Sequence, residues 1–570
     1  MSRFPRLSLT SLAVMAALNW PAAAQTDTAE ADTGAYLAAR SAISDHDYDD
    51  AAYWFSRALV RDADNPVLLE GLVLAQIGTG QFGSAANVAE RLTKIGGRSI
   101  AANIALLVRD AGAEDYAALL AAPEERAIGN LMDKLVRAWA EFGAGRMSEA
   151  VTLFDEIAAT EGLKPFGLYH KALALAAVGD FEAADAILSG QADGPLVINR
   201  RGVIAHVQIL SQLERFDDAL ALLDRSFGTR PEPQVDAMRA GLRAGKPLTY
   251  DVALSAREGI AEVLFTLAAA LNGEAEPGYT LLYARAAMAL NAGHVDAVLT
   301  TADLLQALGQ LDLAAEVYAS IPAGDPAFYN AELGRIGLLF ALERKDEGFA
   351  ALNALAERFP DLSLVHTKLG DHLRREERFA EAAEAYGRAI DHLGPPEPRN
   401  WGLFYARAIS YERAGQWDKA EPDFRRALEL SPDQAEVLNY LGYSFVDKGE
   451  NLDEALALIE RAVAIYPDQG YIIDSLAWAY FRLGRYQDAL APMEKASLLE
   501  PVDPIVTDHL GDVYWAVGRE LEARFQWRRA LSFDPEEKDA TRIRRKLEVG
   551  LDAVLAEEGA PPLAEPAHGN

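Results

Sequence analysis

The chain has 570 residues, half of them apolar, and carries a formal net charge of −32. Such an acidic surface repels nucleic acid phosphates and disfavours docking on anionic lipid, so we expect no nucleic acid partner. The sequence contains no cysteine, which excludes disulfides, thiolate metal sites, a cysteine nucleophile and a lipid anchor on an N-terminal cysteine.

Residues 1–24 have the pattern of a secretory signal peptide. Arginines precede an uncharged apolar run over about residues 7–20, and alanines at 22–24 supply the small residues that a signal peptidase needs. The run is too short to span a bilayer comfortably, although an uncleaved membrane anchor is the alternative interpretation. We therefore predict cleavage after Ala24, a periplasmic location in a Gram-negative cell, and a short linker over residues 25–33.

Residues 34–360 carry a weak but persistent helix–turn–helix pattern. Small and aromatic residues recur at spacings of three and four, as in Ala51 followed by Phe55. These spacings place the residues on one face of a helix. The pattern predicts divergent helical repeats, with the register unassigned over residues 95–130 and 226–280.

Two short motifs in this region imitate ligand sites. Residues 78–83 match the glycine spacing of a dinucleotide-binding loop, but that site needs a preceding strand, and here a helix precedes the glycines. The acidic run at 45–50 lacks the glycine and the final glutamate of an EF-hand loop, and it more simply begins a helix. We therefore expect no cofactor and no metal ion.

Residues 361–535 repeat with a firm period. Four prolines fall 35, 34 and 34 residues apart, and each ends a similar sequence motif: Pro432, Pro467, Pro501 and Pro535. Upstream of each proline, small residues stand where two helices must approach closely, and large residues fill the space beside them. The unit that shows this best contains Leu510, Gly511, Tyr514, Ala523, Trp527, Ala530 and Pro535.

This phrase resembles the tetratricopeptide repeat (TPR), a helix–turn–helix motif of about 34 residues. The resemblance implies an all-α fold, a right-handed superhelical solenoid in which each hairpin packs on its neighbours. Residues 536–556 have an amphipathic pattern that we interpret as a capping helix. Residues 557–570, rich in proline, alanine and glycine, are expected to form a disordered tail.

In TPR proteins the first helix of each hairpin lines an inner groove that holds a partner. Carried onto this sequence, the resemblance assigns ten residues to the groove: Tyr405, Asn439, Tyr443, Tyr471, Asp474, Trp478, Phe481, Asp508, Asp512 and Trp515. An alternative is that Trp478, Phe481 and Trp515 only pack neighbouring hairpins. The lysines with which chaperone-binding TPR domains clamp a terminal carboxylate are absent, so the acidic groove would suit a basic or helical segment.

The phrases around Tyr440, Trp478 and Trp515 are similar to those of exported proteobacterial TPR proteins. One member type is a lipoprotein adaptor that delivers a carboxyl-terminal processing protease to cell-wall hydrolases. The resemblance implies a cell-envelope adaptor whose protein partners are such a protease and its hydrolase substrates. The chain departs from that group because it has no cysteine for a lipid anchor.

Two other functions stay open on the sequence. One is an assembly scaffold for a secretion, pilus or other envelope complex, and the other, more remote, is an enzyme. No region of domain size lies outside the repeats, so we expect no catalytic residues. The sequence leaves the partner and the oligomeric state open.

Overall fold

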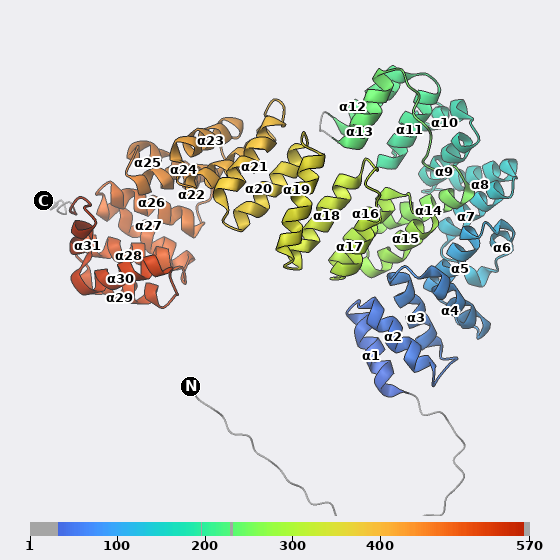
Figure 1. Cartoon of the computed structure of the whole chain (residues 1–570), viewed down its shortest axis with the longest axis horizontal. Coiled ribbons are helices and arrows are strands. Elements are labelled where there is room, and N and C mark those ends of the chain that lie inside the picture. Colours follow the sequence, from blue (N-terminus) through green and yellow to red (C-terminus); the bar gives the residue numbers. More distant parts are fainter. Residues whose placement is uncertain (1–31, 195, 229–231, 564–570) are drawn as a thin grey trace, which may run out of the picture. The chain divides into compact units, whose positions relative to one another are not determined.

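The structure is a computed structural model that describes residues 32–194, 196–228 and 232–563. The predicted signal peptide, most of the linker after it and residues 564–570 of the predicted tail lie outside the described residues. The described residues form 31 α-helices and two short 3-10 helices and contain no β-strand (Figure 1). The all-α architecture predicted from the repeats is confirmed. Within this part of the chain, no helix combines the length and the apolar character needed to cross a membrane.

The chain divides into two compact units, Met1–Lys345 and Asp346–Asn570. The helices of the first unit are α1 (Thr33–Ser44), α2 (Tyr48–Leu59), α3 (Pro66–Gly78), α4 (Phe82–Lys94), α5 (Ile100–Gly112), α6 (Tyr116–Leu120), η1 (Glu124–Arg126), α7 (Asn130–Gly143), α8 (Met147–Ala159), α9 (Lys164–Ala177), α10 (Phe181–Leu188), α11 (Arg200–Gln212), α12 (Phe216–Phe227), α13 (Pro233–Arg243), α14 (Ala256–Leu271), α15 (Pro277–Leu290), α16 (Val295–Ala307), α17 (Leu311–Ala319) and α18 (Phe328–Ala341).

Local chemistry explains how the hairpins of the first unit form. Asn65 caps α3 by accepting hydrogen bonds from the backbone amides of residues 67 and 68. The glycine motif at 78–83 forms the turn between α3 and α4, as expected, and Gly80 adopts a φ of 81°, which favours glycine. In the acidic run, the Asp47 side chain caps α2, which confirms that these acids begin a helix.

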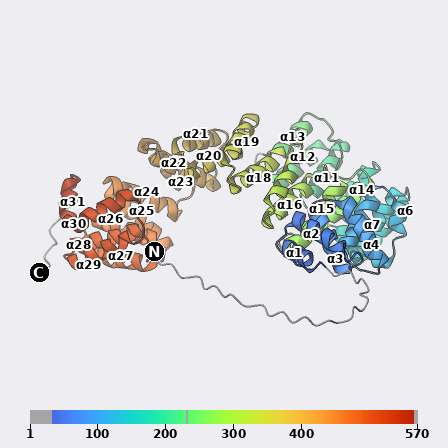
Figure 2. The same ribbon diagram turned by 60° about the horizontal axis from the view of Figure 1, so that its bottom comes forward.

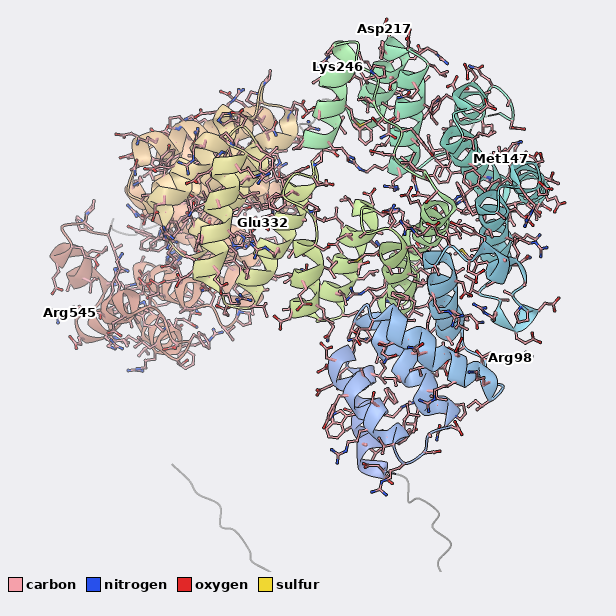
Figure 3. The ribbon with its side chains drawn as sticks, turned by 45° about the vertical axis from the view of Figure 1, so that its right-hand side comes forward. Arg98, Met147, Asp217, Lys246, Glu332 and Arg545 are labelled. Carbon is pink, nitrogen blue, oxygen red and sulfur yellow. The ribbon has the colours of Figure 1, made fainter. Side chains whose placement is uncertain are left out.

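The first unit departs from a simple row of hairpins after α13. The chain passes Lys246 (Figure 3), continues without helix to Ser255 and enters α14, which packs against α5, α7 and α9. Helix α15 then packs against α3 and α5 (Figures 1 and 2). Gly259 permits the close approach of α14, because a Cβ atom there would lie 2.2 Å from the Trp139 ring. The region of unassigned register at 226–280 therefore contains a segment that folds back over earlier helices.

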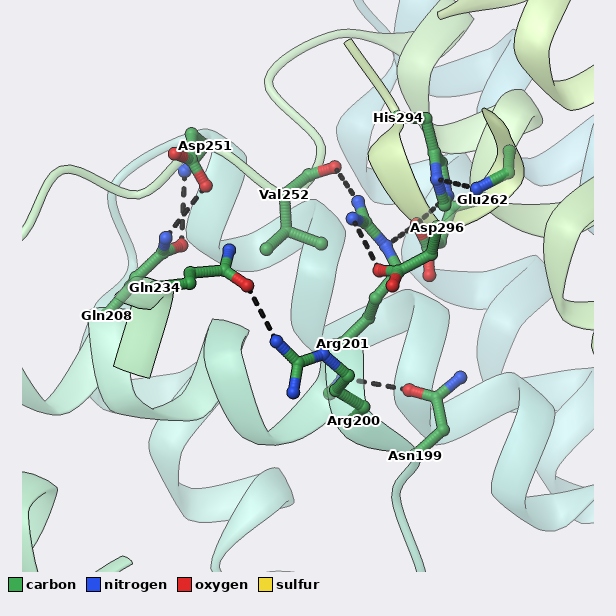
Figure 4. A network of polar contacts seen from close by, with 12 residues as sticks. Asn199, Arg200, Arg201, Gln208, Gln234, Asp251, Val252, Glu262, His294 and Asp296 are labelled. Carbon is green, nitrogen blue, oxygen red and sulfur yellow. Dashed lines mark hydrogen bonds and ion pairs between the residues drawn. The ribbon is translucent and has the colours of Figure 1, made fainter. Parts of the chain in front are cut away.

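A buried polar network holds this returning segment (Figure 4). The Glu262 carboxylate on α14 accepts hydrogen bonds from Tyr169 at 2.9 Å, Arg201 at 2.8 Å and His294 at 3.1 Å. Arg201 also donates to the carbonyl oxygen of Val252 at 3.2 Å. Burial alone would raise the pKa of the Glu262 carboxyl, but the Arg201 charge and these hydrogen bonds hold it well below its usual range. The network ties α9, α11 and α14 together.

The second unit is a regular series of hairpins. Its helices are α19 (Lys345–Arg358), α20 (Ser363–Arg375), α21 (Phe379–Asp391), η2 (Pro398–Asn400), α22 (Trp401–Arg413), α23 (Trp417–Leu430), α24 (Ala435–Lys448), α25 (Leu452–Ile465), α26 (Gly470–Arg482), α27 (Tyr486–Leu499), α28 (Pro504–Ala516), α29 (Glu520–Leu531), α30 (Glu537–Val549) and α31 (Leu551–Glu557).

The small and large residues of the repeat pack as the spacing predicted. Ala455, Ala489 and Ala523 have no exposed surface. A Cβ atom on Gly442 would lie 2.7 Å from Ile459, and one on Gly370 would lie 2.6 Å from the Tyr386 ring. The glycines therefore occupy places where the two helices of a hairpin come too close for a larger residue.

The C-terminal end differs from the prediction of one capping helix over residues 536–556. Gly550, with a φ of 86°, separates α30 from α31. Two ion pairs then hold the shorter helix against the longer one, Arg545 with Glu557 at 2.6 Å and Arg542 with Glu558 at 2.8 Å (Arg545 is labelled in Figure 3). Helical periodicity alone missed the break because the apolar stripe continues across it.

Candidate partner-binding surface

The ten residues predicted to bind a partner lie on the first helices of four successive hairpins. Helix α24 contacts α26, and α26 contacts α28. We call this set of side chains the first-helix face. It consists of Tyr405 on α22; Asn439 and Tyr443 on α24; Tyr471, Asp474, Trp478 and Phe481 on α26; and Asp508, Asp512 and Trp515 on α28.

The chain itself covers the α28 part of this face, which corrects the prediction for its three residues. The Lys546 ammonium of α30 donates to Asp508 at 2.6 Å and to Asp512 at 2.7 Å. The indole of Trp515 donates to Asp552 at 2.7 Å. Asp512 and Lys546 have no exposed surface, so α30, together with Asp552 of α31, occupies the position that we assigned to a partner.

The α26 part of the face is also largely internal. The Trp478 ring stacks on Phe481, with centroids 4.7 Å apart, and on His509 of α28, with centroids 3.9 Å apart. His509 donates from Nδ1 to Asp474 at 3.0 Å. Trp478 and Phe481 are only 8% and 6% exposed. The alternative interpretation of these two aromatics, packing between hairpins, is the one that the structure supports, and Asp474 is likewise not free for a partner.

Charge explains why a histidine is stable in this buried place. Burial lowers the pKa of His509, but the adjacent Asp474 carboxylate outweighs it, and the pKa is raised above its ordinary value. The imidazole and the carboxylate therefore form a buried hydrogen-bonded pair that joins α26 to α28. Sequence reasoning missed His509 because it lies outside the inner positions of the motif.

Tyr405, Tyr443 and Tyr471 form the part of the face that is open to a partner. Tyr471 is 45% exposed, and the other two are half-buried. Among the described residues, no hydrogen bond is formed by these three hydroxyls. Three other tyrosines of the repeats differ, because each donates its hydroxyl to a carboxylate: Tyr440 to Glu412, Tyr480 to Glu460 and Tyr514 to Glu494.

Two further side chains of α24, the buried Asn439 and the half-buried Glu436, lie beside this open part. Asn439 is 8% exposed, and its buried Oδ1 atom has no hydrogen-bond partner in the part of the chain that the structure describes. Glu436 lies one helical turn before it. Burial, followed by the Glu436 charge, raises the pKa of Tyr405 to about 12. Sequence reasoning missed Glu436, although the inner-face positions of the motif include it.

In the first unit, a segment of the chain itself covers part of helix α11, so less of that helix is exposed to a partner. Gln208 of α11 exchanges two hydrogen bonds with Asp251, at 2.7 and 3.2 Å (Figure 4). Gln212 donates to the carbonyl oxygen of Leu248 at 2.6 Å. The segment between α13 and α14 thus lies along α11 as an extended ligand would.

Comparison with known proteins agrees with the repeat pattern. A tetratricopeptide repeat family model matches residues 338–398, 405–470 and 475–538. A TPR repeat-containing protein of Pseudomonas aeruginosa is 28% identical over 177 residues, which cover 31% of this chain and 29% of that protein. The chain thus matches less than a third of that relative's length.

Two solved structures are also similar. A tetratricopeptide repeat protein from Parabacteroides merdae is 16% identical, with 45% of this chain and 98% of that chain covered and a TM-score of 0.36. Yeast Tom70 is 14% identical, with 93% and 99% covered and a TM-score of 0.32. The three matched segments, the helical hairpins and their buried small residues together show that this chain contains tetratricopeptide repeats within residues 338–538.

Proposed function

We propose that this chain is a periplasmic adaptor that binds a segment of a partner protein on the open part of its first-helix face. TPR proteins bind protein partners and are generally not enzymes, and TPR repeats imply an interaction scaffold. The observation that carries the proposal is the group of three tyrosines whose hydroxyls form no hydrogen bond with any residue that the structure describes. Tyrosine combines a large apolar ring with a polar tip and loses little entropy on binding, as is typical of residues that dominate interfaces.

The finer proposal is that the partners are a carboxyl-terminal processing protease and its cell-wall hydrolase substrates. The support is the similarity of the phrases around Tyr440, Trp478 and Trp515 to exported adaptors, together with the signal-peptide pattern of residues 1–24. An adaptor that holds both proteins raises the effective concentration of one at the other without any chemistry of its own. We therefore propose a non-catalytic role.

Affinity purification of the tagged full chain from periplasmic extract tests this proposal. We expect the chain in the periplasmic fraction, with a processing protease and a hydrolase in the eluate. Recovery of secretion or pilus subunits instead would favour the assembly scaffold, and hydrolysis by the pure chain would favour an enzyme.

Variants connect the capture to the surface. The Tyr405→Ala, Tyr443→Ala, Tyr471→Ala triple variant should lose the partner. Phe525→Ala serves as the control, because this α29 ring is 63% exposed and lies outside the first-helix face. If the triple variant folds and captures as much partner as the control, the surface assignment is wrong.

A further inference from the structure

The first helices of successive hairpins in the second unit differ in the partner that the chain supplies to one equivalent position. In α28, Asp508 stands three residues before the motif Gly511, and the chain supplies Lys546 to it. In α26 the equivalent residue is Asp474, and the chain supplies His509. In α24 it is Asn439, three residues before Gly442.

The α24 position has no such complement from the chain. Asn439 is more than nine-tenths buried, yet its Oδ1 atom has no partner among the described residues. A buried amide oxygen that has lost its water without gaining a donor is costly, on the order of 1–3 kcal/mol. Unsatisfied groups of this kind are rare in folded proteins and ask for an explanation. A donor from another molecule would satisfy this oxygen once the amide side chain rotates toward the surface, because the atom itself is covered in this structure.

Glu436, one helical turn before Asn439 on α24, supplies a negative charge beside it. This half-buried carboxylate makes no ion pair or hydrogen bond in the described part of the chain. Burial and then the Glu436 charge raise the pKa of both Tyr405 and Tyr471, so the carboxylate lies near both hydroxyls. Arg374 is a basic side chain near Tyr405, but its Nε donates to the Tyr386 hydroxyl at 3.4 Å.

We propose that Glu436, Asn439, Tyr405 and Tyr471 form a site for a lysine or arginine side chain of the partner, which we call the α24 site. This inference rests on the proposed function and names the chemistry that the surface selects. The cation donates to the Glu436 carboxylate and to Asn439 Oδ1. The tyrosine rings flank its aliphatic stem and attract its charge through their π faces.

The chain already contains an example of this recognition. Lys546 enters α28 between two carboxylates, and its ammonium lies 5.9 Å from the centroid of the Trp527 ring. An acid, a second polar acceptor and an aromatic ring therefore already hold one lysine on this face. The α24 site has the same three kinds of group, and the formal charge of −32 favours a basic segment over an acidic one.

Glu436 also has a role that needs no ligand. It stands in the first turn of α24, where a negative charge interacts favourably with the helix dipole. That role accounts for the acid but not for the buried oxygen of Asn439. Glu436→Gln keeps the shape of the side chain, and the melting temperature of the variant reports any loss of stability.

The test uses the full chain and four pools of fluorescein-labelled hexapeptides with randomised flanking residues. The pools carry Lys, Arg, Gln or Glu at the third position, and fluorescence anisotropy measures binding. We expect the Lys and Arg pools to bind at least about tenfold more tightly than the other two, the size of one charge-assisted hydrogen bond. This preference should weaken as salt is added.

Matched variants decide the assignment. Glu436→Gln should remove the preference for Lys and Arg. Glu384→Gln, which removes the same charge from an exposed position on α21, should keep it. The assignment of the α24 site would be overturned by any of three results. These are equal binding of all four pools, failure of all four pools to bind, and an unchanged preference for Lys and Arg in Glu436→Gln. Equal binding that Tyr471→Ala abolishes would overturn the α24 site alone and leave the proposed partner surface intact.

Discussion

Lys546 is the residue whose removal should most disturb the second unit. Its ammonium has no exposed surface and lies between Asp508 and Asp512, which are themselves almost fully buried. Lys546→Met keeps most of the aliphatic stem and removes the charge. Two carboxylates would then remain buried, with the Arg542 guanidinium at 3.9 and 3.6 Å from them.

The magnitude follows from the loss of one member of a buried ionic group. Removing one partner of a buried ion pair typically costs about 3–5 kcal/mol, because the remaining charge stays desolvated. Arg542 compensates in part, so we expect a value of about 3 kcal/mol for local opening of α30. Since about 1.4 kcal/mol corresponds to a factor of ten, backbone amides of α30 should exchange roughly a hundredfold faster.

Hydrogen exchange on the full chain, read by mass spectrometry, measures this effect. Amides of α2 and α4 in the first unit serve as an internal reference. Lys538→Met is the matched control, because Lys538 is exposed on the same helix. A triple variant that adds Asp508→Asn and Asp512→Asn removes the stranded charges and should recover most of the protection. If α30 in Lys546→Met exchanges like α30 in the control, the buried ionic group does not hold this helix.

Three other predictions test the remaining buried contacts. Glu262→Gln should leave the largely buried Arg201 with only its longer ion pair to Asp296, at 3.5 Å, among the described residues. It should cost about 3–5 kcal/mol, seen as faster hydrogen exchange of α11 and α14. Because the folded pKa of Glu262 is lowered, its contribution is present above the unfolded value near 4.3 and disappears as pH falls toward the folded pKa, so acid should release α14 in the wild type. The pH dependence that His509 contributes to stability has the opposite sign, because its pKa is raised in the folded state. Its contribution is complete below the unfolded value near 6.5 and disappears as pH rises through the folded pKa. Hydrogen exchange of α28 should therefore quicken as pH rises in the wild type but not in His509→Gln. Gly259→Ala should place a methyl group against the Trp139 ring and lower stability by about 1–3 kcal/mol in thermal unfolding, whereas Gly83→Ala, at an open position, should change it little.

Much of the candidate surface could be predicted from the sequence, but its exposure could not. The motif predicted that Tyr405, Tyr443 and Tyr471 lie on the first helices of their hairpins, and the structure places them there. It placed Asp508 and Asp512 in equivalent positions, and the structure buries them under α30. Motif position is a property of one hairpin, whereas exposure depends on which later segment covers it.

The sequence by itself determined the hairpins of residues 361–535. Helical spacing, the small residues at Gly442 and Ala455, and the prolines that end each unit act over a few turns, so they can be read without knowing the rest of the chain. The tertiary structure decided where α14 and α30 lie. An amphipathic helix shows the same periodicity whichever surface it covers, and the contacts that select the surface join distant residues, such as Glu262 with Tyr169 and Lys546 with Asp508. The chain's own helices therefore decide which part of the first-helix face remains for a partner.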